Sequence, residues 1–126
     1  MPIAVGIDLV SYEEIAEALR RRDRYLRRIY TDVELDVCGD NPRLLATCFA
    51  AKEATMKALH RADEPLPWRS IELRMRPGSQ PSLELTGAAA SLALKRGVTH
   101  LSVSVAHTGH SAAAVVLATS VEICDE

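Results

Sequence analysis

The order of apolar and polar positions predicts that strands and helices occupy separate stretches of this chain. Residues 3–10 are rich in β-branched side chains and predict a strand that ends near Asp8. Residues 71–76 alternate between apolar and charged side chains, and the turn segment PGSQPS leads from them into SLEL, so the two stretches predict a β-hairpin. Residues 101–106 alternate in the same way, and the turn HTGHS leads into the antiparallel partner AAAVVLAT.

Two capping patterns mark the first helices. Ser11 is followed three residues later by Glu14, which is the pattern of a capping box and predicts a helix over residues 12–22. Thr31 and Glu34 repeat the pattern and predict a second, short helix that ends near Val37.

The longest helix is predicted over residues 42–60, with Asn41 as its N-cap and Pro42 at its first position. A later alanine-rich helix ends at Gly97. Helices and hairpins therefore segregate along the chain instead of alternating as βαβ units. This order predicts an α+β fold with antiparallel sheet and packed helices, built as a single domain over residues 1–126.

Composition is that of an ordinary globular domain. The chain has 126 residues, of which 48% are hydrophobic and 25% charged, and no apolar run approaches the roughly 20 residues that span a bilayer. Three widely spaced cysteines match neither a disulfide framework nor a zinc pattern. We therefore expect a cytoplasmic protein without a membrane partner.

Arginine is concentrated near the N-terminus. Residues 20–28 contain six arginines, although the formal net charge of the chain is only −2. Such a block is either a solvated helix face or a surface that attracts an acidic partner. Aromatic residues make up 4% of the chain and no recognition motif accompanies the arginines, so we do not expect nucleic acid as the partner.

Three charged residues of the long helix stand in the segment FAAKEATMKAL. Glu53 and Lys57 are four residues apart and therefore neighbours on one helix face. They, with Lys52, form either an exposed ion pair or charges held for a ligand, and the small apolar flanking residues indicate a helix packed on several sides. Asp8, which follows Gly6 in the first strand, is either a turn former or, with Glu53, a magnesium site.

His107 ends the predicted strand SVSVAH, at the point where the chain turns. It is either a surface turn residue or a group that contacts a phosphate or moves a proton.

Three separated segments now coincide. GIDLV near the N-terminus, FAAKEATMKAL in the middle and SVAHTGHSAAAVV near the C-terminus resemble the signature segments of the holo-acyl-carrier-protein synthase family, the small 4'-phosphopantetheinyl transferases. Their order and spacing match that family over essentially the whole chain. The resemblance implies the fold of these transferases, and the transfer of 4'-phosphopantetheine from coenzyme A to a serine of an apo acyl carrier protein, with release of adenosine 3',5'-bisphosphate.

The resemblance also implies roles for individual residues. Asp8 and Glu53 match the Mg²⁺ ligands of the family, and with Lys57 and His107 they form the expected catalytic set. Lys57, His107 and Thr108 are expected to contact coenzyme A. The proton acceptor stays open between a water held by the metal, Glu53 and His107, with the water favoured.

The partner surface and the assembly are implied in the same way. Arg21, Arg24 and Arg28 fall where the family presents basic residues to an acidic helix of the carrier protein. The small members of the family are homotrimers, so Asp8 and Glu53 of one chain are expected to face the His107 strand of a neighbour, or the reverse.

Four departures from the family pattern stand beside these matches. Glu14 replaces an arginine at the partner surface, Cys48 replaces the arginine before FAAKEA, residues 60–62 replace a glycine-rich turn, and Ala106 replaces a hydroxyl residue. They leave a second interpretation, a homologue that binds coenzyme A or a carrier protein without efficient turnover. A third interpretation is an unrelated small metal-dependent hydrolase.

Overall fold

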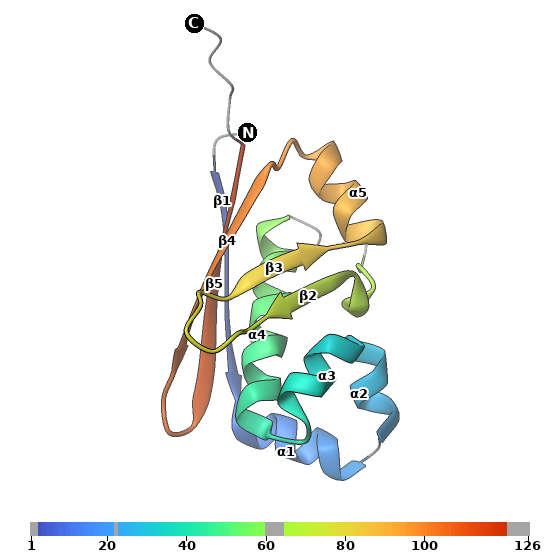
Figure 1. Ribbon diagram of the computed structural model, residues 1–126, viewed down its shortest axis with the longest axis vertical. Coiled ribbons are helices and arrows are strands. Elements are labelled where there is room, and N and C mark those ends of the chain that lie inside the picture. The colour runs from blue at the N-terminus through green and yellow to red at the C-terminus, as the bar shows by residue number, and fades with distance from the viewer. Residues whose placement is uncertain (1–2, 22, 60–64, 121–126) are drawn as a thin grey trace, which may run out of the picture.

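The long helix α4 (Pro42–Ala58) runs between two antiparallel sheets (Figure 1). The computed structural model describes residues 3–21, 23–59 and 65–120. Buried residues lie on every side of α4, including Leu45, Cys48, Ala51 and Ala54. A helix that is packed on several sides needs small side chains for close contact with its neighbours, which explains the alanine-rich sequence of α4. The expectation of a helix packed on several sides is confirmed.

The first sheet has the strand order β1-β5-β4 and is antiparallel throughout. Strand β5 (Ser111–Thr119) lies in the centre, between β1 (Ile3–Ser11) and β4 (His100–His107). Its alanine-rich sequence is buried at alternate positions against α4, because small side chains let the helix lie close to the sheet. The predicted hairpin of residues 101–119 is confirmed.

Asp8 lies within β1 and not at its end. The strand was expected to end near Asp8, but its pairing with β5 continues to Ser11, which faces Ser111. The backbone ladder extends the strand because β5 offers partners up to the β4–β5 turn. Asp8 therefore lies within the part of β1 that is paired with β5, with paired residues before and after it along the strand.

The second sheet is the predicted hairpin of β2 (Ile71–Arg74) and β3 (Ser82–Leu85). It crosses the other side of α4 (Figure 1). A 3-10 turn, η1 (Trp68–Ser70), precedes it, and α5 (Gly87–Lys95) follows it and ends before Gly97, whose φ of 71° suits glycine.

Short helices close one end of the molecule. Helix α1 (Tyr12–Arg21) begins where Ser11 accepts from the amide of Glu14 at 3.1 Å. Helix α3 (Asp32–Cys38) begins at the capping box that was predicted from Thr31. The α2 helix (Asp23–Ile29) was missed. Four of its seven residues are charged, so it shows little helical period, and the chain directly after it is anchored by the fully buried Tyr30.

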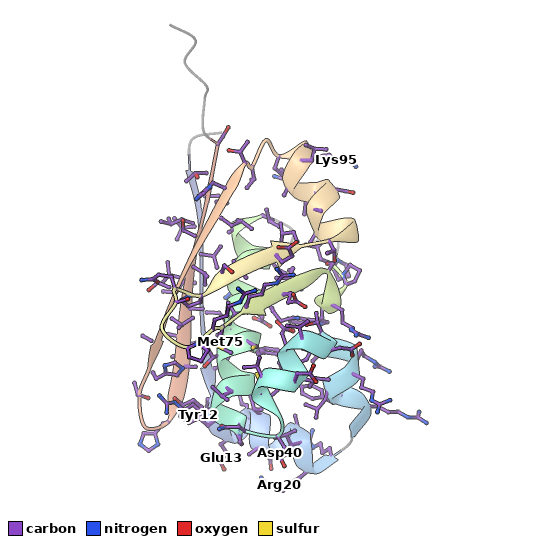
Figure 2. All side chains as sticks on the ribbon, viewed as in Figure 1. Tyr12, Glu13, Arg20, Asp40, Met75 and Lys95 are labelled. Carbon is purple, nitrogen blue, oxygen red and sulfur yellow. The ribbon has the colours of Figure 1, made fainter. Side chains whose placement is uncertain are left out.

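The start of α1 is tied to the β4–β5 turn. The backbone amide of Tyr12 donates to the His110 carbonyl at 2.9 Å, and its phenol donates to the Thr108 carbonyl at 2.8 Å. Figure 2 shows Tyr12 beside the end of this hairpin. Among the described residues, none of the helices combines the length and the apolarity needed to cross a membrane.

Candidate active site

A close approach between β1 and α4 builds the centre of the candidate site. A Cβ atom placed on Gly6 would lie 1.8 Å from the backbone carbonyl oxygen of Ala54. Only glycine permits this contact, because it has no Cβ atom. The contact brings Asp8, two residues further along β1, to the part of α4 that carries Glu53 and Lys57.

Asp8 and Glu53 face each other across this contact. Burial raises the pKa of Glu53, the negative charge of Asp8 raises it further, and Lys57 opposes both effects. A hydrogen bond with Asp8 also raises this pKa. Two carboxylates that share one pocket repel each other when both are ionised. The pair is therefore suited to a cation or to a shared proton.

Lys57 of α4 reaches β1 at Asp8. Its ammonium nitrogen donates to the Asp8 carboxylate at 3.1 Å and to the backbone carbonyl of Ile7 at 3.0 Å. The Lys57 side chain is 54% exposed while that of Asp8 is 13% exposed. The lysine head is thus anchored at the strand but open to solvent, where it can also meet an anion.

Lys52 belongs to the interior and not to this site. Its side chain and that of Glu34 are both fully buried, and they form an ion pair of 2.6 Å. The ammonium also donates to the carbonyl of Ile71 at 2.6 Å. Glu34 further accepts from the amides of Thr31 and Leu73 at 2.9 and 2.8 Å. The charge of Lys52 is therefore satisfied by the fold, which joins α3, α4 and β2.

His107 stands apart from the two carboxylates within one chain. It ends β4 and pairs with Ala112, whereas Asp8 pairs with Ala114 on the other side of β5. Two strand spacings and a shift of two residues separate their Cα atoms by roughly 12 Å. His107 instead contacts Thr47 of α4, with 2.7 Å between its Nε2 and the threonine hydroxyl. Burial, and then the positive charge of Arg43, lower the pKa of His107.

Thr108 organises the turn that follows His107. Its hydroxyl accepts from the amides of His110 and Ser111 at 3.0 and 2.9 Å. This arrangement holds the chain in its turn at the end of β4. A contact of Thr108 with coenzyme A stays a prediction.

The three arginines expected to meet a partner do lie together. Arg21, Arg24 and Arg28 line a hollow of about 370 Å³ between α1 and α2, together with Tyr25. Burial raises the pKa of Tyr25, and the charges of Glu14 and Glu53 raise it further. The basic hollow therefore lies within electrostatic range of Glu53.

The departures from the family pattern fall in different places. Cys48 is fully buried, and its sulfur lies 3.5 Å from that of Cys38, so this change belongs to the core. Glu14 lies on α1 near Glu53 and adds to the negative potential there. Ala106 is exposed on β4. Residues 60–62 lie outside the described residues.

A family model described as the 4'-phosphopantetheinyl transferase superfamily matches residues 4–116 of the chain. The chain belongs to this superfamily. The matched range includes both carboxylates, Lys57 and the end of β4, and the α+β fold is the one seen in solved structures of the family.

Relatives of this chain include proteins named holo-[acyl-carrier-protein] synthase. The holo-[acyl-carrier-protein] synthase of Desulforudis audaxviator is 38% identical over 122 residues, which cover 94% of this chain and 93% of that protein. The holo-[acyl-carrier-protein] synthase of Salinispora arenicola is 39% identical and covers 94% of this chain and 98% of its own. A solved holo-[acyl-carrier-protein] synthase of Helicobacter pylori in complex with coenzyme A is 29% identical, with a TM-score of 0.80, over 91% of this chain and 99% of that one.

Two residues near the candidate site residues had no signal in the sequence. Thr47 stands in an ordinary alanine-rich helix, and Tyr25 stands in the missed helix α2. The contact of Thr47 with His107 and the place of Tyr25 in the basic hollow follow from tertiary packing, which no local pattern encodes. A capping box at Thr31 did mark Glu34, but its second role as the partner of Lys52 was not apparent.

Proposed function

We propose that this protein is a holo-[acyl-carrier-protein] synthase. It transfers the 4'-phosphopantetheine arm of coenzyme A to a serine hydroxyl of an apo acyl carrier protein and releases adenosine 3',5'-bisphosphate. The observation that carries this proposal is the meeting of Asp8, Glu53 and Lys57 where β1 and α4 touch. Membership of the superfamily and the names of the relatives support the reaction.

We further propose that Asp8 and Glu53 hold Mg²⁺. Their carboxylates are close enough to raise the pKa of Glu53, so a divalent cation would relieve their repulsion. Magnesium takes one or two protein carboxylates and completes its shell with water and substrate phosphate, and this donor set fits that requirement. Bound there, the ion would polarise the diphosphate of coenzyme A.

The residues of the chain bind and orient the reactants. Phosphoryl transfer depends mainly on positioning and on neutralising charge. Lys57, anchored at Asp8 and exposed, offsets negative charge on the diphosphate during attack of the serine oxygen on the β-phosphorus. The serine proton passes to water, to Glu53 or to His107, whose pKa is lowered by burial and by the charge of Arg43, which favours the neutral ring that accepts a proton.

The transfer test uses a panel of apo-carrier proteins, incubated with coenzyme A and analysed by mass spectrometry. We expect a mass gain of one phosphopantetheine on the wild-type protein's client, and loss of that gain on removal of Mg²⁺. Asp8→Asn and Glu53→Gln should abolish the gain. Asp32→Asn is the matched control, because this exposed carboxylate pairs only with Arg69 among the described residues and should leave transfer unchanged.

The rival functions give different results in the same test. A folded protein that modifies none of the carriers, but binds coenzyme A, is the non-transferring homologue. Hydrolysis of another phosphate ester, lost in Asp8→Asn while coenzyme A is ignored, identifies the unrelated hydrolase.

The uncovered face of the first sheet supports the proposed homotrimer. Val5, Ile7 and Leu9 of β1 are exposed on this face, and Val115 and Leu117 of β5 lie beside them in the register of the sheet. Leu9 is 69% exposed. Contiguous apolar patches of this kind mark interaction surfaces.

Assembly would also bring together residues that one chain keeps apart. The roughly 12 Å between Asp8 and His107 across β5 supports a site completed by the His107 strand of a neighbour. Sedimentation velocity tests this proposal: wild type should sediment as a trimer and Ile7→Glu as a monomer. A monomeric wild type that transfers at full rate overturns it.

The carrier protein is proposed to dock on the basic hollow of Arg21, Arg24 and Arg28. Tyr25 also lines this hollow, and the charge of Glu53 contributes to its raised pKa, which supports docking on the side of the molecule that carries the carboxylate pair. Surface charges of this kind mainly accelerate association and add salt dependence. Arg21→Glu with Arg24→Glu should weaken carrier binding at low salt, and unchanged affinity there contradicts the docking proposal.

The buried free thiols of Cys38 and Cys48 support a reducing, cytoplasmic location.

A further inference from the structure

The imidazole of His107 is held against α4 by a threonine. His107 is the last residue of β4, and its Nε2 lies 2.7 Å from the hydroxyl oxygen of Thr47. Thr47 lies in the first half of α4 and is only 1% exposed. Its hydroxyl therefore has little access to water and depends on protein partners for its hydrogen bonds.

The direction of this hydrogen bond follows from the second contact of the hydroxyl. Thr47 donates to the backbone carbonyl of Arg43, one turn earlier in α4, at 2.8 Å. A hydroxyl has a single proton to donate, and its lone pairs accept. With that proton directed at the Arg43 carbonyl, the Nε2 of His107 is the donor in the 2.7 Å contact. If the Thr47 hydroxyl donated to Nε2 instead, no proton would lie between this hydroxyl and the Arg43 carbonyl oxygen.

We infer that Thr47 is a positioning residue: it holds the His107 ring with Nε2–H toward α4 and leaves Nδ1 as the atom that acts on a bound group. In a neutral imidazole one nitrogen donates and the other accepts. Nδ1 therefore accepts a proton or a hydrogen bond. It donates to a phosphate only after the ring is protonated, which burial and Arg43 oppose. This inference rests on the proposed function only where transfer is the readout.

The same helix offers a matched control. Thr55 lies two turns further along α4, is fully buried and donates to the carbonyl of Ala51 at 2.7 Å. It repeats the backbone contact of Thr47, and no histidine is among its described hydrogen-bond partners. Valine keeps the shape of threonine but removes the hydroxyl. Thr47→Val and Thr55→Val therefore lose the same bond to the helix, and only the first loses the bond to His107.

Nitrogen-15 NMR of the histidine side chains provides a test that does not depend on activity. His107→Gln identifies the His107 signals among the four histidines of the chain. In wild type we expect a neutral His107 ring with its proton on Nε2, and an Nε2–H signal protected from exchange with water. Thr47→Val should remove this protection, whereas Thr47→Ser and Thr55→Val should keep it. A wild-type ring protonated on Nδ1, or an unchanged signal in Thr47→Val, overturns the inference.

Transfer kinetics provide the second readout. Positioned acid–base groups contribute about 10²–10⁴-fold to rates, so a ring that loses its orientation should lower kcat on the order of tenfold. We expect this loss in Thr47→Val, recovery in Thr47→Ser and none in Thr55→Val. An unaltered kcat in Thr47→Val removes the role in transfer. If wild type modifies no carrier, the proposed function fails, and the NMR result still decides the hydrogen bond.

Discussion

The buried ion pair between Lys52 and Glu34 allows a quantitative prediction about stability. Lys52→Met keeps the length of the side chain and removes its charge. The Glu34 carboxylate would then keep only its bonds to the amides of Thr31 and Leu73 and lose a charge partner at 2.6 Å, with no access to water. Removing one partner of a buried pair costs about 3–5 kcal/mol. That is a large part of the 5–15 kcal/mol by which domains are typically stable.

The size of this effect comes from burial. Burial lowers the pKa of Lys52, and Glu34 only partly offsets it, so each charge depends on the other. An exposed pair gives the comparison: Arg69 and Asp32 are 3.1 Å apart in solvent. Such pairs contribute about 0–1 kcal/mol, so Arg69→Met is the control.

Urea unfolding followed by tryptophan fluorescence measures both variants at one protein concentration. Trp68 is the single tryptophan of the chain and stacks on Phe49 with 4.9 Å between ring centroids, so its emission reports on the core. With an m-value of about 2 kcal/mol/M, Lys52→Met should lower the midpoint by about 2 M. Adding Glu34→Gln should cost less than the sum of the single changes, because residues in contact couple by about 0.5–3 kcal/mol. A Lys52→Met midpoint equal to that of Arg69→Met would refute the reasoning.

Two further predictions concern the site. Gly6→Ala should prevent the close packing of β1 on α4, because its Cβ atom would lie 1.8 Å from the carbonyl oxygen of Ala54. Circular dichroism and thermal unfolding should therefore show a strongly destabilised protein. A variant as stable as wild type would contradict this contact. Arg43→Met should raise the pKa of His107 toward its ordinary 6.5 without reaching it, because burial, the larger cause, remains. The pKa of His107 is lower in the folded chain than in the unfolded chain. The contribution of His107 to the free energy of unfolding is therefore fully present at pH values above its pKa in the unfolded chain, and it is lost as the pH falls through its pKa in the folded chain. NMR titration measures the His107 pKa, and unfolding experiments between pH 5 and 7 measure the stability. Between these pH values Arg43→Met should lose less free energy of unfolding than wild type. A His107 pKa that is unchanged in Arg43→Met would show that Arg43 does not act on it.

Local chemistry determined much of this protein. Alternation of apolar and polar positions predicts each hairpin, and the Thr31 capping box and the Asn41 and Pro42 pair place the starts of two helices. These signals survive because hydrogen bonds within a few residues produce them. The signature around Asp8 and Glu53 also needs no structure to be noticed. A helix such as α2, whose polar sequence is held by a buried neighbour, leaves no such local signal.

Tertiary structure decided what each charged residue does. Lys52 and Lys57 are alike in the sequence, yet α4 turns the first into the core against Glu34 and the second toward Asp8 and solvent. Two side chains that are five residues apart on a helix point to different faces. Only the packing of α4 between two sheets decides which of these faces is buried. The same packing sets Thr47 beneath His107, a contact across 60 residues that depends on where β4 ends. The sequence alone thus determined most of the elements and the candidate residues, whereas the folded arrangement decided which charges are buried in the core and which stay exposed beside Asp8.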